Sequence, residues 1–264
     1  YIDGEWVESS NKSTRDIINP YNQETIFTVA EGTKEDVERA ILAARRSFED
    51  GEWSLETSEV RGKKVRAVAD KIKENREELA KLETLDTGKT LEESYADMDD
   101  IHNVFMYFAG LADKDGGEII NSPIPNAESK VVKEPVGVVT QITPWNYPLL
   151  QASWKIAPAL ATGCSLVMKP SEITPLTTIR VFELMEEVGF PKGTINLVLG
   201  AGSEVGDVMS GHEEVDLVSF TGGIETGKHI MKQAANHVTD VALELGGKNP
   251  NIIFDDADFE LAVD

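Results

Sequence analysis

Apolar residues recur at helical spacing through much of the first 115 residues. Between positions 33 and 49 they fall on one face, and Thr33 with Asp36 has the pattern of an N-terminal capping box. The same spacing predicts one or two helices over 58–85, ended by Gly88, and a long helix over 91–113. Shorter alternating patches in 1–30 predict a hairpin and a crossing strand.

From residue 134 onward, short apolar runs alternate with helical patterns. Val136 to Ile142 is a β-branched run between two prolines, which predicts a buried strand. A helix is expected over Leu149 to Leu160 with a kink at Pro158, and a second buried strand over Ser165 to Met168. Further helices are expected over 175–189, with Thr174 as cap, over 203–209 and over 225–236, and further strands over 194–199, 216–220 and 238–243. This alternation predicts an α/β protein with a doubly wound, mostly parallel, Rossmann-like sheet.

Three segments follow from these patterns. Residues 1–115 form strands and helices that pack on the sheet, and residues 134–264 form the sheet domain. Between them, 116–133 contains Pro123 and Pro125 and is expected to be a connection with short extended pieces. The chain begins without methionine and stops where a helix pattern starts, so we expect it to be part of a longer protein.

Charge and cysteine content narrow the class of protein. The 264 residues carry a net charge of −22, which disfavours nucleic acids and anionic membranes as partners. No long apolar run and no signal peptide is found, so a soluble chain is expected. The single cysteine, Cys164, fits a reducing, cytoplasmic location. It starts a predicted buried strand and is expected to be inert rather than a nucleophile. The four histidines show no metal-ligand spacing, which argues against catalytic zinc.

Chemistry-bearing residues follow the predicted strands. The loops Thr143–Tyr147 and Lys169–Glu172 lie where the carboxyl ends of parallel strands bind ligands. The Glu172 carboxylate can accept hydrogen bonds from both hydroxyls of an adenosine ribose and would repel a 2′-phosphate, which favours NAD over NADP. Glu244 ends a predicted apolar strand, where a buried carboxylate would have a raised pKa suited to a base. The alternative is a solvated glutamate.

Two glycine-rich stretches are candidate phosphate-binding loops. Gly200, Gly202 and Gly206 follow a strand, but their spacing is one residue off the dinucleotide fingerprint. Thr221-Gly222-Gly223 is the better candidate, because helix amides from Ile224 onward would face a pyrophosphate there.

An aromatic pair suggests a cationic substrate. Tyr147 and Trp154 are seven residues apart, so they can face the same side of a helix and line one tunnel. Ring faces suit a quaternary ammonium, which cannot donate hydrogen bonds. Ordinary packing of helix on sheet remains the alternative.

Four motifs stand in an order that resembles the aldehyde dehydrogenase superfamily. They are PWNYP at 144–148, KPSE at 169–172, SFTGG with Gly227 at 219–227 and ELGGKNP at 244–250. The likeness extends over the whole chain and is strongest to the betaine aldehyde dehydrogenases, whose chains are roughly twice as long. The resemblance implies the amino-terminal half of that fold, with part of an oligomerisation hairpin near 116–133 and the nucleophilic cysteine beyond residue 264.

The resemblance also implies an activity and roles for residues. The activity would be NAD-dependent oxidation of betaine aldehyde to glycine betaine, an osmoprotectant, through a thioester, in a homodimer or homotetramer. Catalytic roles would fall to Asn146 as oxyanion donor, where the alternative is a turn asparagine, and to Glu244 as general base. Lys155 would act in a proton relay, the alternative being a structural charge. Tyr147 and Trp154 would belong to an aromatic box for trimethylammonium.

Ligand-binding positions carry over in the same way. Those implied for the cofactor are Thr143, Pro144, Trp145, Lys169, Pro170, Ser171, Glu172, Gly202, Gly206, Thr221, Gly222, Gly223, Ile224, Glu225, Thr226 and Leu245. A monovalent cation, potassium or sodium, would be held by Asp86 and by carbonyls near Ile18 and Ile173. Two rivals remain: the same chemistry on another aldehyde, and a nucleotide-binding or structural protein that lacks the thiol.

Overall fold

The computed structural model describes residues 1–114 and 116–263. Its centre is a five-stranded parallel sheet with the order β7-β6-β5-β8-β9. These strands are β5 (Val138–Ile142), β6 (Ser165–Lys169), β7 (Ile195–Leu197), β8 (Leu217–Gly222) and β9 (Asp240–Leu245). The order reverses direction at β5, and helices cover both faces, so the doubly wound α/β prediction is confirmed.

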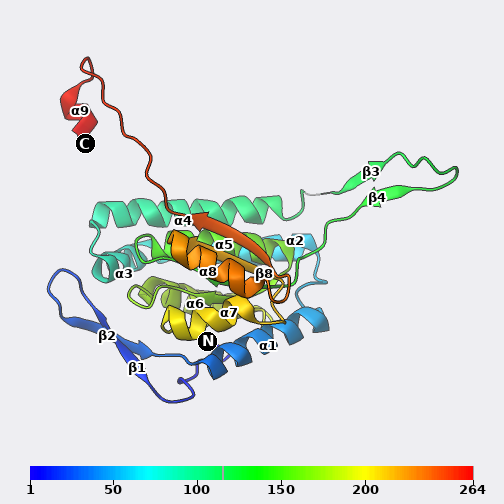
Figure 1. Ribbon diagram of the computed structural model, residues 1–264, viewed down its shortest axis with the longest axis horizontal. Helices are drawn as coiled ribbons and strands as arrows, with labels where there is room; N and C mark the ends of the chain where they lie inside the picture. Colours follow the sequence, from blue (N-terminus) through cyan, green and yellow to red (C-terminus); the bar gives the residue numbers. More distant parts are fainter. Residues whose placement is uncertain (115, 264) are drawn as a thin grey trace.

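Helices α2 to α6 cover one face of the sheet. They are α2 (Ser58–Glu74), α3 (Arg76–Thr87), α4 (Leu91–Leu111), α5 (Pro148–Thr162) and α6 (Leu176–Val188). Their apolar residues form one buried cluster with Val139 of β5 and with Leu166 and Met168 of β6. Figure 1 shows α4 and α5 running side by side in this layer, and their residues are in contact.

The opposite face is covered by α1 (Lys34–Asp50), α7 (Asp207–Gly211) and α8 (Ile224–Ala234). A second buried cluster joins residues of these helices to Val138 and Ile142 of β5. Neighbouring positions of β5 therefore face different layers, as the two-residue repeat of a strand requires. The predicted capping box of α1 is present: the Thr33 hydroxyl accepts from Asp36 N, and the Asp36 carboxylate accepts from Thr33 N.

Two short antiparallel pairs lie outside the central sheet. Strands β1 (Thr14–Ile18) and β2 (Thr25–Ala30) form one of them. The other, β3 (Glu118–Ile120) with β4 (Ser129–Val131), projects from the body in Figure 1. After β9 the chain leads away in another direction to α9 (Phe259–Val263).

Several local expectations need correction. Thr174 does not cap α6, because its hydroxyl donates to Trp145 O at 3.2 Å and Pro175 takes the N-cap position. Helix α5 continues past Pro158 to Thr162. The 203–209 segment begins with a π-helical turn, η1 (Gly202–Gly206), before the short α7. The expectation of one or two helices over 58–85 is confirmed, since two are present, with Asn75 between α2 and α3.

None of the helices in the described parts of the chain combines the length and the apolar run needed to cross a bilayer.

Candidate functional site

The α5 side of the sheet gathers polar groups at the carboxyl ends of three strands. In the parallel register Gln141 pairs with Ser219, and Ser219 pairs with Ala242. Thr221 pairs with Glu244 two residues further on. Because side chains alternate along a strand, Gln141, Ser219, Thr221 and Glu244 all face the α5 side. The sheet thus places Glu244, the predicted base, on the same face as Gln141 and Ser219, which the sequence pattern did not link to it.

Lys155 reaches this polar group from α5. Its Nζ donates to Ser219 Oγ at 3.0 Å, and its backbone carbonyl accepts from Gln141 Nε2 at 2.8 Å. Lys155 is 7% exposed, and burial lowers its pKa to about 8, although the charge of Glu244 opposes that shift. A lysine with that pKa changes charge near neutral pH, which a proton relay requires.

Three buried polar atoms lack partners in this part of the chain. Within the described residues no hydrogen bond is made by Gln141 Oε1, Thr143 Oγ1 or Thr221 Oγ1. Leaving such an atom unsatisfied costs about 1–3 kcal/mol, so each is a natural contact for a bound molecule. Gln141 was missed in the sequence, where a polar residue inside an apolar strand, VVTQI, was the available signal.

Asn146 and Glu244 are both open to solvent. In the described parts of the chain the Asn146 side chain, in the loop before α5, has no hydrogen-bond partner, so its amide is free to donate. The expected burial of Glu244 is wrong for this chain: the residue is exposed on β9. Leu245, its neighbour, is 40% exposed and packs across Gly227, where a Cβ would lie 2.7 Å from Leu245 Cδ2.

The ribose candidates lie on the other face of the sheet. Lys169 follows Met168, which packs on the α5 side, and is only 2% exposed. Its Nζ donates to Pro170 O at 3.0 Å and to Glu172 Oε2 at 3.3 Å. Burial lowers the Lys169 pKa, and Glu172 opposes that effect. Lys169 therefore holds a partly exposed carboxylate in place beside the strand end.

Glu31 and Arg15 stand behind this pair. The Glu31 carboxylate receives Arg15 Nη2 at 2.7 Å and Ala201 N at 3.1 Å, which ties the β1–β2 ribbon to the loop after β7. The hydrogen bond from Arg15 keeps the pKa of Glu31 low. Arg15, Glu31 and Glu172 line the same small recess with Ser171. Nothing in the local sequence around Arg15 had pointed to it.

The loop from Thr221 to Gly223 fits a phosphate group. Gly223 is the N-cap of α8 and makes no side-chain cap, so the first amides of the helix are free. No atom lies within 4 Å of a Cβ built on Gly223, which leaves room for close approach. The Glu225 carboxylate pairs with Lys228 at 2.8 Å and does not cap these amides. Pro144, Trp145, Pro170, Ile224 and Thr226 adjoin these groups in the chain, and Gly202 and Gly206 bound η1. Unpaired amides, open glycines and the orphan Thr143 and Thr221 hydroxyls together fit a dinucleotide.

Tyr147 and Trp154 meet an acidic row on α4. Tyr147 Oη donates to Glu93 Oε1 at 3.1 Å, and this bond raises the Tyr147 pKa. Trp154 lines a pocket of about 500 Å³ together with Asp100. Glu93 and Asp100 are seven residues apart on α4, as Tyr147 and Trp154 are on α5. The two helices therefore set two carboxylates opposite two rings.

That pocket also receives Tyr107 and Phe108 from α4 and Leu150 from α5. Trp154 is 50% exposed and Tyr107 is 63% exposed, so large ring surfaces face the open space. The expected packing of this helix on the rest of the body is confirmed, because Met98, Ile101 and Phe105 lie in the buried cluster. Tyr107 lies outside that cluster, and nothing in the sequence indicated that it would line a pocket.

The cation candidates converge near the start of α6. Asp86 Oδ2 accepts from Leu176 N at 2.9 Å, while Oδ1 is buried without a hydrogen bond to any described residue. Ile17, next to Ile18, packs in one cluster with Leu176, and Ile173 lies three residues before it. Burial raises the Asp86 pKa to about 7. A cation at Oδ1 would compensate the buried charge.

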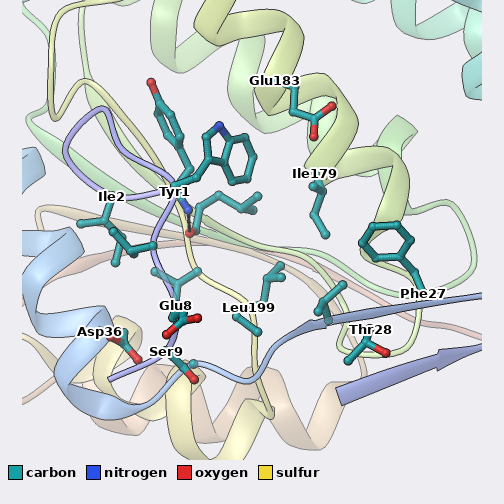
Figure 2. Close-up of a pocket in the computed structure, with 17 residues that line it drawn as sticks. Tyr1, Ile2, Glu8, Ser9, Phe27, Thr28, Asp36, Ile179, Glu183 and Leu199 are labelled. Carbon is teal, nitrogen blue, oxygen red and sulfur yellow. Dashed lines mark hydrogen bonds between the residues drawn. The ribbon is translucent and has the colours of Figure 1, made fainter. Parts of the chain in front are cut away.

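A second pocket, shown in Figure 2, lies elsewhere. It has about 350 Å³ and is enclosed by the first residues of the chain, β2, α6 and the segment after β7. Its lining contains none of the predicted site residues. Of its three acidic residues, Asp36 serves the α1 cap, Glu183 accepts from Arg180 at 2.8 Å, and Glu8 is exposed. Because the lining shares no residue with the predicted site, this pocket is separate from the site at the strand ends.

Comparisons with known proteins give the family of the chain. The family described as "Aldehyde dehydrogenase family" matches residues 6–264. Betaine aldehyde dehydrogenase of Bacillus subtilis is 67% identical over 100% of this chain and 54% of its own length. Aminoaldehyde dehydrogenase 1, peroxisomal, of Pisum sativum is 46% identical over 98% of this chain and 53% of its own length.

A solved structure of Staphylococcus aureus betaine aldehyde dehydrogenase in complex with NAD+ is 90% identical and superposes with a TM-score of 0.98. It covers 100% of this chain and 52% of its own. The chain thus spans about half the length of the relatives it matches. With the family pattern and these identities extending over nearly every residue, the chain belongs to the aldehyde dehydrogenase family.

Proposed function

We propose that this chain is the amino-terminal part of an NAD-dependent dehydrogenase that oxidises betaine aldehyde to glycine betaine. The observation that carries the proposal is the pairing of Tyr147 and Trp154 on α5 with Glu93 and Asp100 on α4. Ring faces and nearby carboxylates attract a trimethylammonium group without needing hydrogen bonds from it. The relatives named betaine aldehyde dehydrogenase support the same choice.

The cofactor proposed is NAD, whose chemistry is to accept a hydride from the aldehyde carbon. Glu172, held by Lys169, would bind the ribose hydroxyls, and the free α8 amides at Gly223 would bind the pyrophosphate. The Thr143 and Thr221 hydroxyls would gain the partners they lack. The related structure in complex with NAD+ supports this assignment.

The reaction would proceed in two stages. A cysteine outside this chain adds to the aldehyde carbon, and after oxidation a thioester remains on that cysteine. The Asn146 amide donates to the carbonyl oxygen as it becomes negative. Glu244 takes a proton from water, whose oxygen forms the new bond to carbon while the carbon–sulfur bond breaks. The acid and the thiolate are released. A related structure with a BME-modified cysteine supports a reactive thiol in such enzymes.

Lys155 would pass the proton onward from Glu244. Its pKa of about 8 and its hydrogen bond to Ser219 place an amine that can change charge on the same face as the base.

Assembly and location complete the proposal. The projecting β3–β4 hairpin exposes Ile119 by 82% and Ile120 by 48%, which suits contact with a second copy in a homodimer or homotetramer. Potassium or sodium would bind Asp86 Oδ1 with the carbonyls near Ile18 and Ile173. The single cysteine is compatible with a cytoplasmic location.

The direct test uses the full-length protein with NAD and two aldehydes of matched shape. Betaine aldehyde is compared with tert-butylacetaldehyde, in which a neutral carbon replaces the ammonium nitrogen. We expect kcat/KM to favour betaine aldehyde by at least about tenfold, since a desolvated cation–π contact contributes about 2 kcal/mol. Equal values for the two aldehydes contradict the substrate assignment. NAD binding without NADH formation contradicts the enzyme and leaves a nucleotide-binding protein.

A second candidate substrate is an aminoaldehyde. Relatives named aminoaldehyde dehydrogenase share 46% identity, and the Asp100 carboxylate in the Trp154 pocket could accept hydrogen bonds from a primary ammonium. Aminopropionaldehyde in the same assay separates the two substrates. A higher kcat/KM for aminopropionaldehyde than for betaine aldehyde would show that selectivity comes from hydrogen bonding rather than from ring contact.

A further inference from the structure

Lys89 occupies one face of the Tyr147 ring. It lies in the loop between α3 and α4, directly after Gly88, which takes the left-handed conformation at φ 80°. The Lys89 Nζ stands 4.0 Å from the centroid of the Tyr147 ring. This distance is within the range of a cation–π contact.

The ammonium is itself fixed. Lys89 Nζ donates to Asp97 Oδ2 at 2.5 Å and lies 3.7 Å from Glu83 Oε1. The side chains of Lys89, Asp97 and Glu83 are 8%, 7% and 0% exposed. Glu83 is anchored in turn, because its Oε2 accepts from Thr177 Oγ1 at 2.6 Å. A buried ammonium held by two carboxylates has little freedom, so it is a rigid support for the ring.

Tyr147 is therefore restrained at two places. Lys89 lies against one ring face, and the hydroxyl at the ring tip donates to Glu93 at 3.1 Å. A ring held at its tip alone could still turn about its long axis. Contact at the face stops that rotation and leaves the opposite face as the one available to a ligand.

We propose that Lys89 is a positioning residue for the cationic end of the substrate, acting through the Tyr147 ring. The inference rests on the function proposed above. Lys89 sets the plane of Tyr147 so that one ring face is presented to the trimethylammonium group. It does not touch the substrate, and Asp97 and Glu83 offset its positive charge.

The residue's position also explains why a lysine beside a cation-binding ring is tolerated. An unpaired ammonium would repel a second cation across the ring. Here two buried carboxylates stand at the ammonium and a third, on Glu93, at the ring tip, so the local charge is negative. Lys89 can therefore orient the Tyr147 ring without repelling a cationic substrate on the other ring face.

The test is a double-mutant cycle in the full-length protein, with Lys89→Met and Tyr147→Leu alone and together. In the parent, Lys89→Met should raise KM for betaine aldehyde about fivefold to tenfold, within the range of one cation–π contact. The KM for tert-butylacetaldehyde and both kcat values should change less than about twofold. With Leu at position 147, Lys89→Met should change KM for betaine aldehyde less than about twofold, because the ring it acts through is gone.

Two further variants separate positioning from folding. Lys89→Arg keeps a cation over the ring and should retain most of the preference for betaine aldehyde. Lys89→Met combined with Asp97→Asn removes the nearer of the two carboxylates that Lys89→Met leaves unpaired. It should show the fivefold to tenfold rise in KM for betaine aldehyde even where Lys89→Met alone does not fold. Lys81→Met, on the exposed face of α3, is the matched control and should leave both aldehydes unaffected.

The outcomes are distinct. Equal KM changes for the two aldehydes, or the same change with and without the Tyr147 ring, overturn the proposal. A lower KM for betaine aldehyde in Lys89→Met also overturns it, since Lys89 would then be a competing cation. If the parent protein does not prefer betaine aldehyde over tert-butylacetaldehyde, the proposed function is wrong. If the parent shows that preference but the double-mutant cycle shows no coupling, the proposal for Lys89 alone is wrong.

Discussion

Strands β6 and β9 belong to the same parallel sheet, but their carboxyl ends differ in burial. Every position of β6 is buried, and Lys169 at its end is 2% exposed. Along β9 no position is fully buried, and Leu245 at its end is 40% exposed. The β6 end is enclosed by residues of this chain, including Arg15 of β1 and Glu31, which directly follows β2. The side that carries Glu244 stays open.

The two strand ends carry two different parts of the proposed site. Binding the adenosine end needs groups that do not move. Lys169 holds Glu172, and Arg15 holds Glu31 in the same recess. Glu244 pairs in register with a residue of β8, but its carboxylate accepts no hydrogen bond from the described residues. We expect substitutions on the closed side to act on cofactor binding and substitutions on the open side to act on turnover.

Glu244→Gln should have the largest effect. Loss of the base should lower kcat about 100- to 10,000-fold, because water is no longer activated, while one equivalent of NADH still forms rapidly before that step. Stopped-flow absorbance separates the burst from the steady state. Glu59→Gln, on the far exposed surface of α2, is the control. A kcat within threefold of the parent contradicts the role of Glu244.

Glu172→Gln tests the closed side. Replacing a carboxylate that accepts from two hydroxyls should weaken NAD binding about 10- to 100-fold, since hydrogen bonds to charged groups contribute about 1.5–3 kcal/mol. NADP binding should weaken less or improve, because the repulsive charge is gone. Calorimetric titration of both cofactors measures this. An unchanged ratio of the two affinities excludes Glu172 as the selecting group.

Lys155 lies on the same face of the sheet as Glu244, and its titration gives a pH prediction. With a pKa of about 8, the amine is mostly protonated at pH 7 and mostly neutral at pH 9. If the neutral amine accepts the proton, kcat should rise about tenfold over that range. The rise should disappear in Lys155→Met but persist in Lys63→Met, an exposed lysine on α2. A profile that is identical in parent and Lys155→Met rules out the relay.

The same group affects stability in a defined direction. The Lys155 pKa lies below its usual 10.5 in the fold, so the protonated form is disfavoured there. The penalty is fully present below pH 8 and is relieved as pH rises toward 10.5. The free energy of unfolding of the parent, relative to Lys155→Met, should therefore increase by about 1–3 kcal/mol over that window. Denaturant titrations at several pH values measure it, and a decrease contradicts the assigned shift.

The smallest effect concerns the cation at Asp86. Potassium chloride should raise Tm by about 2–4 °C over the same concentration of N-methylglucamine chloride, and Asp86→Asn should abolish the difference. Asp255→Asn, in the exposed segment after β9, serves as the control. Equal sensitivity of Asp86→Asn and the parent to potassium shows that the ion acts elsewhere.

Sequence patterns predicted the sheet well because β5 and β6 are buried throughout and the helices keep one apolar face. The α1 capping box and Gly88 at the end of α3 were read from local sequence alone. Glu172 and Lys169 were predictable for the same reason, being neighbours in the chain. The α4 contribution was missed, because Glu93, Asp100 and Tyr107 reach the site only through the packing of α4 on α5.

The burial of Glu244 was mispredicted for a related reason. An apolar strand ending in a carboxylate implies a buried carboxylate only when both neighbours of the strand are present. In this chain β9 pairs with β8 on one side, which leaves the end of the sheet open. A sequence pattern predicts that a residue lies on a strand, but it does not predict whether that strand is paired on both sides.

The most direct measurement of the central claim is the substrate preference of Trp154→Ala. The preference is the ratio of kcat/KM for betaine aldehyde to kcat/KM for tert-butylacetaldehyde in the full-length protein. Removing the half-exposed ring should lower that ratio about tenfold or more, because only the cation loses its ring contact. Trp154→Phe should keep part of it. An unchanged ratio in Trp154→Ala contradicts the account of how this family member recognises its substrate.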